Sequence, residues 1–99
     1  MSADALLGVP FNVTSYSLLL MMVGQVVNMI PDRYIHTIGD VHIYKNHIEQ
    51  VRTQLSREPY SLSDMKINSS IKNIDDFKYD DFKLYNYKFH PAIKGKISV

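Results

Sequence analysis

The sequence predicts an α+β fold, and three stretches of its 99 residues support that prediction. Residues 13–30 place apolar side chains at three- and four-residue intervals, which predicts a helix of about five turns. Residues 34–44 alternate as a strand does, and residues 82–89 are rich in aromatic side chains, which strands favour. With 45% apolar residues, the chain can bury a modest core in one domain.

The predicted helix over 13–30 is apolar on nearly all sides. One face carries Val13, Tyr16, Leu20, Val23, Val27 and Ile30. The opposite face carries Leu18, Met21, Met22, Val26 and Met29. Such a helix is typical of the buried centre of a larger structure. Pro31 is predicted to end it.

The stretch before this helix combines polar side chains with backbone-restricting residues. Ser2 and Asp4 open it, Gly8 would allow a backbone conformation or close approach that a side chain obstructs, and Pro10 fixes φ. Asn12 stands at the predicted N-cap. Polar groups at a helix N-terminus suit a small anionic ligand. An ordinary loop leading into a helix has the same pattern, so both interpretations stay open.

The predicted strand over 34–44 places His42 and Tyr44 on one face, roughly 7 Å apart along the strand. This separation suits a single small polar ligand, although a structural histidine would give the same pattern. No Asp or Glu stands at a typical ligand spacing from His36, His42 or His47, so we predict no metal site.

The rest of the chain is predicted to form short elements. Asn46 and Glu49 make a capping-box pattern, which opens a second helix that ends before Pro59. The other predicted elements are a strand over 65–68, a turn over 69–73, short helical turns over 75–78 and 80–83, and a tail over 91–99.

Charge and composition exclude several classes of protein. The net charge of +1, from 11 basic and 10 acidic residues, gives no signature of binding to a nucleic acid polymer. The absence of cysteine excludes a disulfide framework and fits an intracellular protein. No secretory signal is evident, and the longest apolar run, residues 18–23, is far shorter than the ~20 residues that cross a bilayer. We therefore expect a soluble, cytoplasmic protein without membrane partners.

Several motifs, in order along the chain, resemble those of the thymidylate synthase family. The first is Ser-Ala-Asp-Ala-Leu-Leu-Gly-Val-Pro-Phe-Asn over residues 2–12, and the others lie over 34–47, 54–59, 74–77 and 87–94. They match the last third of a family subunit. The resemblance implies that residues 1–99 are a single partial domain, the C-terminal portion of the family fold, in which a long buried helix packs on a mixed sheet.

The resemblance also implies an activity and its reactants. Thymidylate synthases are homodimers that methylate dUMP reductively to dTMP, with 5,10-methylenetetrahydrofolate as co-substrate and no metal. Asn12 would donate to O4 and accept from N3–H of the pyrimidine, Ser2 would bind the phosphate, and His42 and Tyr44 would hold the sugar 3′-hydroxyl. The implied dUMP-binding residues are Ser2, Ala3, Asp4, Asn12, His42, Ile43 and Tyr44. The implied folate-binding residues are Asp4, Leu7, Gly8, Phe11 and Ser98, the last in a closing C-terminal segment.

Two departures from the family pattern limit what this chain can do. The family's nucleophilic cysteine lies upstream in a Pro-Cys-His motif, and this chain has no cysteine. Met1 stands where the family has a phosphate-binding arginine. We therefore expect no catalytic residue here and no activity from the chain alone. We expect a truncated gene model, a remnant, or one half of a split gene that needs an upstream complementary fragment.

Two alternatives to methyl transfer stay open. A non-catalytic nucleotide-binding remnant would need the binding residues but no nucleophile. A deoxyuridylate hydroxymethylase, in which water rather than hydride captures the exocyclic methylene, would use the same residues. The cytidylate version is disfavoured because Asn12 matches uracil.

Overall fold

The computed structural model describes residues 2–97. The chain forms two compact units. The first comprises Met1–Thr14, Ile35–Pro59 and Phe89–Val99, and the second comprises Ser15–Tyr34 and Tyr60–Lys88. Each unit combines helical residues with a two-stranded sheet, so the predicted α+β class is confirmed. The strands of the described residues form two separate pairs, one parallel and one antiparallel.

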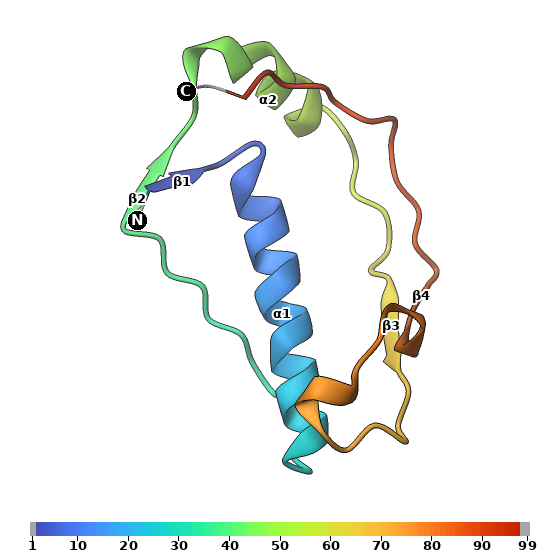
Figure 1. Ribbon diagram of the computed structural model, residues 1–99. Helices are drawn as coiled ribbons and strands as arrows, with labels where there is room; N and C mark the ends of the chain where they lie inside the picture. The colour runs from blue at the N-terminus through green and yellow to red at the C-terminus, as the bar shows by residue number, and fades with distance from the viewer. Residues whose placement is uncertain (1, 98–99) are drawn as a thin grey trace. The chain divides into compact units, whose positions relative to one another are not determined.

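The sheet of the first unit joins two segments that are far apart in the sequence. Strand β1 (Ser2–Asp4) pairs in parallel with β2 (Asp40–His42), and the backbone N–H of Ala5 extends the pairing by donating to the carbonyl of His42 at 2.9 Å. Figure 1 shows the two short strands side by side. The predicted strand over 34–44 is thus correct only for residues 40–42, because its partner β1 is three residues long.

The 3-10 turn η1 (Lys45–His47) follows, and then helix α2 (Ile48–Leu55). The predicted capping box does not form, because the N-cap of α2 is His47, whose side chain makes no cap hydrogen bond. The carboxylate of Glu49 instead accepts a hydrogen bond from the guanidinium of Arg52 at 2.7 Å. The helix ends before Pro59, as predicted.

The C-terminal residues of the first unit run along α2 (Figure 1). The guanidinium of Arg57 donates to the carbonyl of Pro91 at 2.7 Å, and the amide of Gln50 donates to the carbonyl of Lys94 at 3.3 Å. Side chains near α2 thus hold the backbone of the last residues.

Helix α1 (Gly8–Val26) begins five residues earlier than predicted. The carboxylate of Asp4 accepts from the backbone N–H groups of Leu6 and Leu7, at 3.0 and 3.3 Å, and so orders the turn that leads into the helix. Pro10 is compatible with the first turn, where a backbone N–H has no helical partner. The predicted N-cap role of Asn12 is therefore wrong, because Asn12 lies inside the helix.

Helix α1 also ends before the residue predicted to stop it. Asn28 has a left-handed φ of 55°, and the N–H of Met29 donates to the carbonyl of Gly24 at 2.8 Å. This closure is typical of a helix C-terminus with a left-handed residue. A Cβ added to Gly24 would lie 2.9 Å from both the Met29 carbonyl oxygen and the ring of Pro31, so the returning chain needs glycine there.

The expected burial of this helix is not found within the described residues. Gly24 is the one buried residue of α1, and Phe11, Tyr16, Leu19 and Val23 are exposed. A chain of 99 residues has too little apolar surface to cover such a helix on all sides. By length and composition alone, with a mean hydropathy of 1.2, α1 is long and apolar enough to cross a membrane. Core helices of soluble proteins have the same properties.

The second unit contains the antiparallel pair of β3 (Asp64–Ile67) and β4 (Phe82–Tyr85). Between them lie the 3-10 turns η2 (Ile74–Asp76) and η3 (Tyr79–Asp81). Each begins one residue earlier and ends two residues earlier than the short helical turns predicted over 75–78 and 80–83, and residues 82–83 belong to β4 instead. The rings of Phe77 and Phe82 pack with centroids 5.6 Å apart. The predicted strand over 82–89 is correct only for its first half, since Asn86 adopts a left-handed φ of 56°.

A small polar network fixes the turns of this unit. The carboxylate of Asp81 accepts hydrogen bonds from the side chain of Asn68 and from the backbone N–H of Lys78, both at 2.8 Å. These two bonds favour the ionised form and lower the pKa of Asp81 below its ordinary value.

Candidate functional site

The parallel pairing of β1 and β2 brings together the residues of two predicted motifs. In its register Ser2 lies opposite Asp40, Ala3 opposite Val41 and Asp4 opposite His42. Ser2 is exposed, whereas Ala3, Asp4 and His42 are half-buried. Polar groups from the start and the middle of the chain therefore meet in one unit, although some forty residues separate them in the sequence.

His42 and Tyr44 lie against one another, as the strand alternation predicts. Their ring centroids are 4.7 Å apart, with the planes at 81°, which is an edge-to-face contact. The Nε2 atom of His42 is buried and has no hydrogen-bond partner among the described residues. Buried polar atoms are normally hydrogen-bonded, so a ligand or a water molecule is expected to bond to this nitrogen. Ile43, which lies between these two residues in the sequence, is about half exposed.

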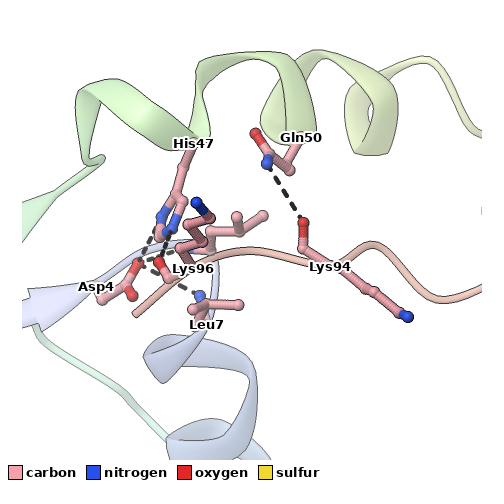
Figure 2. A network of polar contacts seen from close by, with 7 residues as sticks. Asp4, Leu7, His47, Gln50, Lys94 and Lys96 are labelled. Atoms are coloured by element: carbon pink, nitrogen blue, oxygen red, sulfur yellow. Dashed lines mark hydrogen bonds and ion pairs between the residues drawn. The ribbon is translucent and has the colours of Figure 1, made fainter. Parts of the chain in front are cut away.

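The Asp4 carboxylate contacts both the turn that leads into α1 and His47 (Figure 2). Its Oδ1 atom accepts the two loop hydrogen bonds from Leu6 and Leu7 and lies 4.0 Å from Nδ1 of His47. Figure 2 shows the carboxylate turned toward both groups. Its side chain keeps 21% of its surface exposed, which leaves room for a further contact.

Of the remaining predicted site residues, Leu7 joins this group through its backbone N–H, which donates to Asp4, whereas Phe11 and Asn12 take no part in the contacts just described. Asn12 is half-buried and Phe11 is 76% exposed, both on α1. Leu7 and Gly8 are half-buried, and Ser98 lies outside the described residues. The reason predicted for Gly8 is wrong within this chain: its φ is not left-handed, and an added Cβ would make an ordinary 3.6 Å contact with Asp4.

Comparison with protein families gives one match over the whole chain. The model of the thymidylate synthase family matches residues 1–99. The chain belongs to the thymidylate synthase family. It is 57% identical over 98 residues to the thymidylate synthase of Mycoplasma mobile and 58% identical over 98 residues to that of Aster yellows witches'-broom phytoplasma. These alignments cover 99% of this chain and 34% of each relative, so the chain spans about one third of their length.

A solved structure shows the same arrangement in the thymidylate synthase family. Thermostable thymidylate synthase A from Bacillus subtilis superposes with a TM-score of 0.95 at 40% sequence identity. The alignment covers 99% of this chain and 35% of the Bacillus chain. The resemblance drawn from the sequence motifs is thereby confirmed at the level of family and fold.

One residue of this family member had no role in the sequence-based prediction. His47 is fully buried, and its Nε2 atom lies 2.7 Å from the carbonyl oxygen of Lys96. In the sequence it stood out only as a possible metal ligand, although it falls in the matched motif over 34–47. A polar residue next to a predicted capping pattern is the signal that would have placed it at a helix start.

The described residues contain no group of three or more His, Cys, Asp or Glu side chains that could hold a metal ion. Two titratable side chains do approach each other, since Asp4 and His47 are 4.0 Å apart at their nearest atoms. The described residues of this site offer hydrogen-bonding groups and aromatic ring surfaces.

Proposed function

We propose that this chain is the C-terminal segment of a thymidylate synthase and carries binding residues for dUMP and for 5,10-methylenetetrahydrofolate. The complete protein would methylate dUMP reductively to dTMP. The observation that carries the proposal is the parallel pairing of β1 with β2, which sets Asp4 opposite His42, with Ser2 two residues earlier on the same strand as Asp4. Membership of the family supplies the reaction class.

The nucleotide would contact both strands of this pair. Ser2, exposed on β1, would donate to the phosphate. His42 and Tyr44, in mutual ring contact, would hold the sugar 3′-hydroxyl, with Ala3 and Ile43 beside them. Asn12 would identify uracil, because its amide can donate to O4 and accept from N3–H at the same time.

The folate would lie toward the loop between β1 and α1. Asp4 would meet the pyrimidine through its backbone and the pterin through its carboxylate, of which Oδ1 is already engaged by the loop amides. Leu7, Gly8 and the exposed ring of Phe11 would line the folate surface, and Ser98 would belong to the closing segment.

In this proposal the chain binds and orients reactants but does not supply the nucleophile. It has no cysteine, so the group that adds to the pyrimidine must come from an upstream part of the subunit or from a complementary fragment. The complete protein would be a cytoplasmic homodimer that uses no metal, and residues 1–99 would be a single partial domain of each subunit.

Absence of the nucleophile also favours a second candidate, a nucleotide-binding remnant without chemistry. A deoxyuridylate hydroxymethylase would use the same binding residues and differ in the last step, where water replaces hydride. Both alternatives predict nucleotide binding, and they differ from methyl transfer in the product.

A chimaera separates these candidates. The part of Mycoplasma mobile thymidylate synthase that precedes the matched region would be joined to these 99 residues and compared with a variant lacking the upstream nucleophilic cysteine. We expect dihydrofolate formation and dTMP as the product from the first protein and neither from the second. Binding of dUMP without turnover would favour the remnant, and hydroxymethylated product without dihydrofolate would favour the hydroxymethylase.

A matched pair of variants tests the proposed sugar contact in the same chimaera. Tyr44→Phe removes only the phenolic hydroxyl, whereas Tyr87→Phe makes the same change at a tyrosine in the second unit. We expect Tyr44→Phe to raise KM for dUMP about three- to tenfold, the effect of one lost hydrogen bond, and Tyr87→Phe to leave it within twofold. Equal effects from the two variants would contradict the placement of the sugar.

A further inference from the structure

His47 connects three parts of the first unit through one buried ring (Figure 2). Its Nε2 atom lies 2.7 Å from the carbonyl oxygen of Lys96, and its Nδ1 atom lies 4.0 Å from Oδ1 of Asp4. Its ring meets that of Tyr44 edge to face, with centroids 5.7 Å apart. The side chain thus contacts the C-terminal residues, the last residue of β1 and the residues after β2.

The contact with Lys96 fixes which nitrogen of the ring carries hydrogen. A backbone carbonyl can only accept, so Nε2 of His47 must be the donor. In the neutral ring Nδ1 then has no hydrogen, and it has no hydrogen-bond partner among the described residues. It faces Asp4, a contact that becomes an ion pair only when the ring is protonated.

The C-terminal backbone reaches the ring closely because residue 95 is glycine. A Cβ added to Gly95 would lie 3.3 Å from Nε2 of His47 and 3.4 Å from side-chain carbons of Leu6 and Leu7, which is tighter than ordinary packing. A second and longer hydrogen bond, from the amide of Gln50 to the carbonyl of Lys94 at 3.3 Å, holds the same segment without touching Asp4.

We infer that His47 is a positioning residue that clamps the C-terminal segment, residues 94–96, against Asp4 and Tyr44. The segment would thereby help to hold the carboxylate proposed to meet the folate and the phenol proposed to meet the sugar. The expected effect of the clamp on folate and nucleotide binding rests on the proposed function. The clamp itself rests on the contacts of the buried ring.

The test uses the chimaera described above and two changes at one position. His47→Phe keeps a ring but removes the donor, whereas His47→Gln keeps an amide N–H that can reach the Lys96 carbonyl.

The exposed residues Lys94 and Lys96 are trypsin sites within the clamped segment. We expect His47→Phe to speed cleavage there about three- to tenfold, as one buried hydrogen bond is lost. It should raise KM for methylenetetrahydrofolate by a similar factor with a smaller change in kcat. His47→Gln should stay within about twofold of the parent protein in both measurements.

Two further variants distinguish loss of the clamp from general unfolding of the His47→Phe protein. Gly95→Ala leaves His47 in place but pushes the segment from the ring, so it should also speed cleavage and raise the folate KM. Gln50→Ala removes the tether that does not touch Asp4, so it should speed cleavage modestly and leave the folate KM unchanged. Cleavage at Lys66 and Lys83, in the second unit, reports on general unfolding.

The inference is overturned if His47→Phe and His47→Gln behave alike, or if His47→Phe and Gly95→Ala speed cleavage of the segment without any change in folate affinity. An inactive parent chimaera would count against the proposed function instead. In that case the cleavage rates and equilibrium binding of the folate would still decide whether His47 acts as a clamp.

Discussion

The exposed apolar stripe of α1 should make the purified 99-residue chain self-associate or remain partly unfolded. Tyr16, Leu19 and Val23 lie at three- and four-residue spacing on one side of the helix and are 54%, 44% and 42% exposed. Apolar surface of this kind, gathered on one helix, favours association. We expect light scattering to give a mass above that of a monomer, or proton NMR to give poorly dispersed signals.

The double substitution Leu19→Gln with Val23→Gln tests the cause. Full burial of an aliphatic side chain contributes about 2 kcal/mol of free energy. Leu19 and Val23 are 44% and 42% exposed, so burying that exposed surface in an association would contribute about 1 kcal/mol for each side chain. A symmetric pair of chains would lose about 4 kcal/mol, which weakens association by about two to three orders of magnitude. Glutamine is a good helix former, so α1 itself should persist.

The matched control is Leu62→Gln, because Leu62 is 93% exposed but lies outside α1. It removes exposed apolar surface without touching the stripe and should leave the association unchanged. A monodisperse wild-type monomer with well-dispersed NMR signals would refute the reasoning, as would equal effects of Leu62→Gln and the double substitution.

Three further predictions concern activity, specificity and pH. The 99-residue chain alone should form no dihydrofolate, because it has no cysteine to add to the pyrimidine, and turnover above a no-protein control would refute this. In the active chimaera, Asn12→Asp should lower kcat/KM for dUMP about ten- to a hundredfold and shift preference toward dCMP, because a carboxylate facing O4 sets two acceptors against each other. The lowered pKa of Asp81 adds stability that is present above its ordinary pKa of 3.8 and is lost as the pH falls through the lower, folded value. Asp81→Asn should therefore remove this part of the acid dependence of hydrogen exchange in β3 and β4, and an unchanged acid dependence would show that Asp81 is not its source.

The sequence motifs were sufficient for the family and the fold class, because they involve residues whose spacing is local. The residues 74–76 and 79–81 form the two short turns where acids precede aromatics. His42 and Tyr44 touch because period two in a strand is independent of the rest of the fold. Features with a period of two or of three to four residues were thus predictable.

Features that depend on a contact distant in sequence, or on a competing cap, were not predictable in this way. The start of α1 is set by Asp4, four residues ahead of the helix, whereas the apolar periodicity begins only at Val13. The length of β2 is set by its partner β1. The role of His47 depends on Lys96, forty-nine residues away, and no local pattern encodes that contact.

The corrected start of α1 changes what the Asn12 experiment can decide. With Gly8 as the first helical residue, the backbone N–H of residue 12 has a helical acceptor four residues earlier, so no cap is needed at that position. The half-buried amide of Asn12 is therefore not required to begin the helix. An unchanged preference of Asn12→Asp for dUMP over dCMP would then mean that the pyrimidine lies elsewhere, since a capping role no longer offers an alternative explanation.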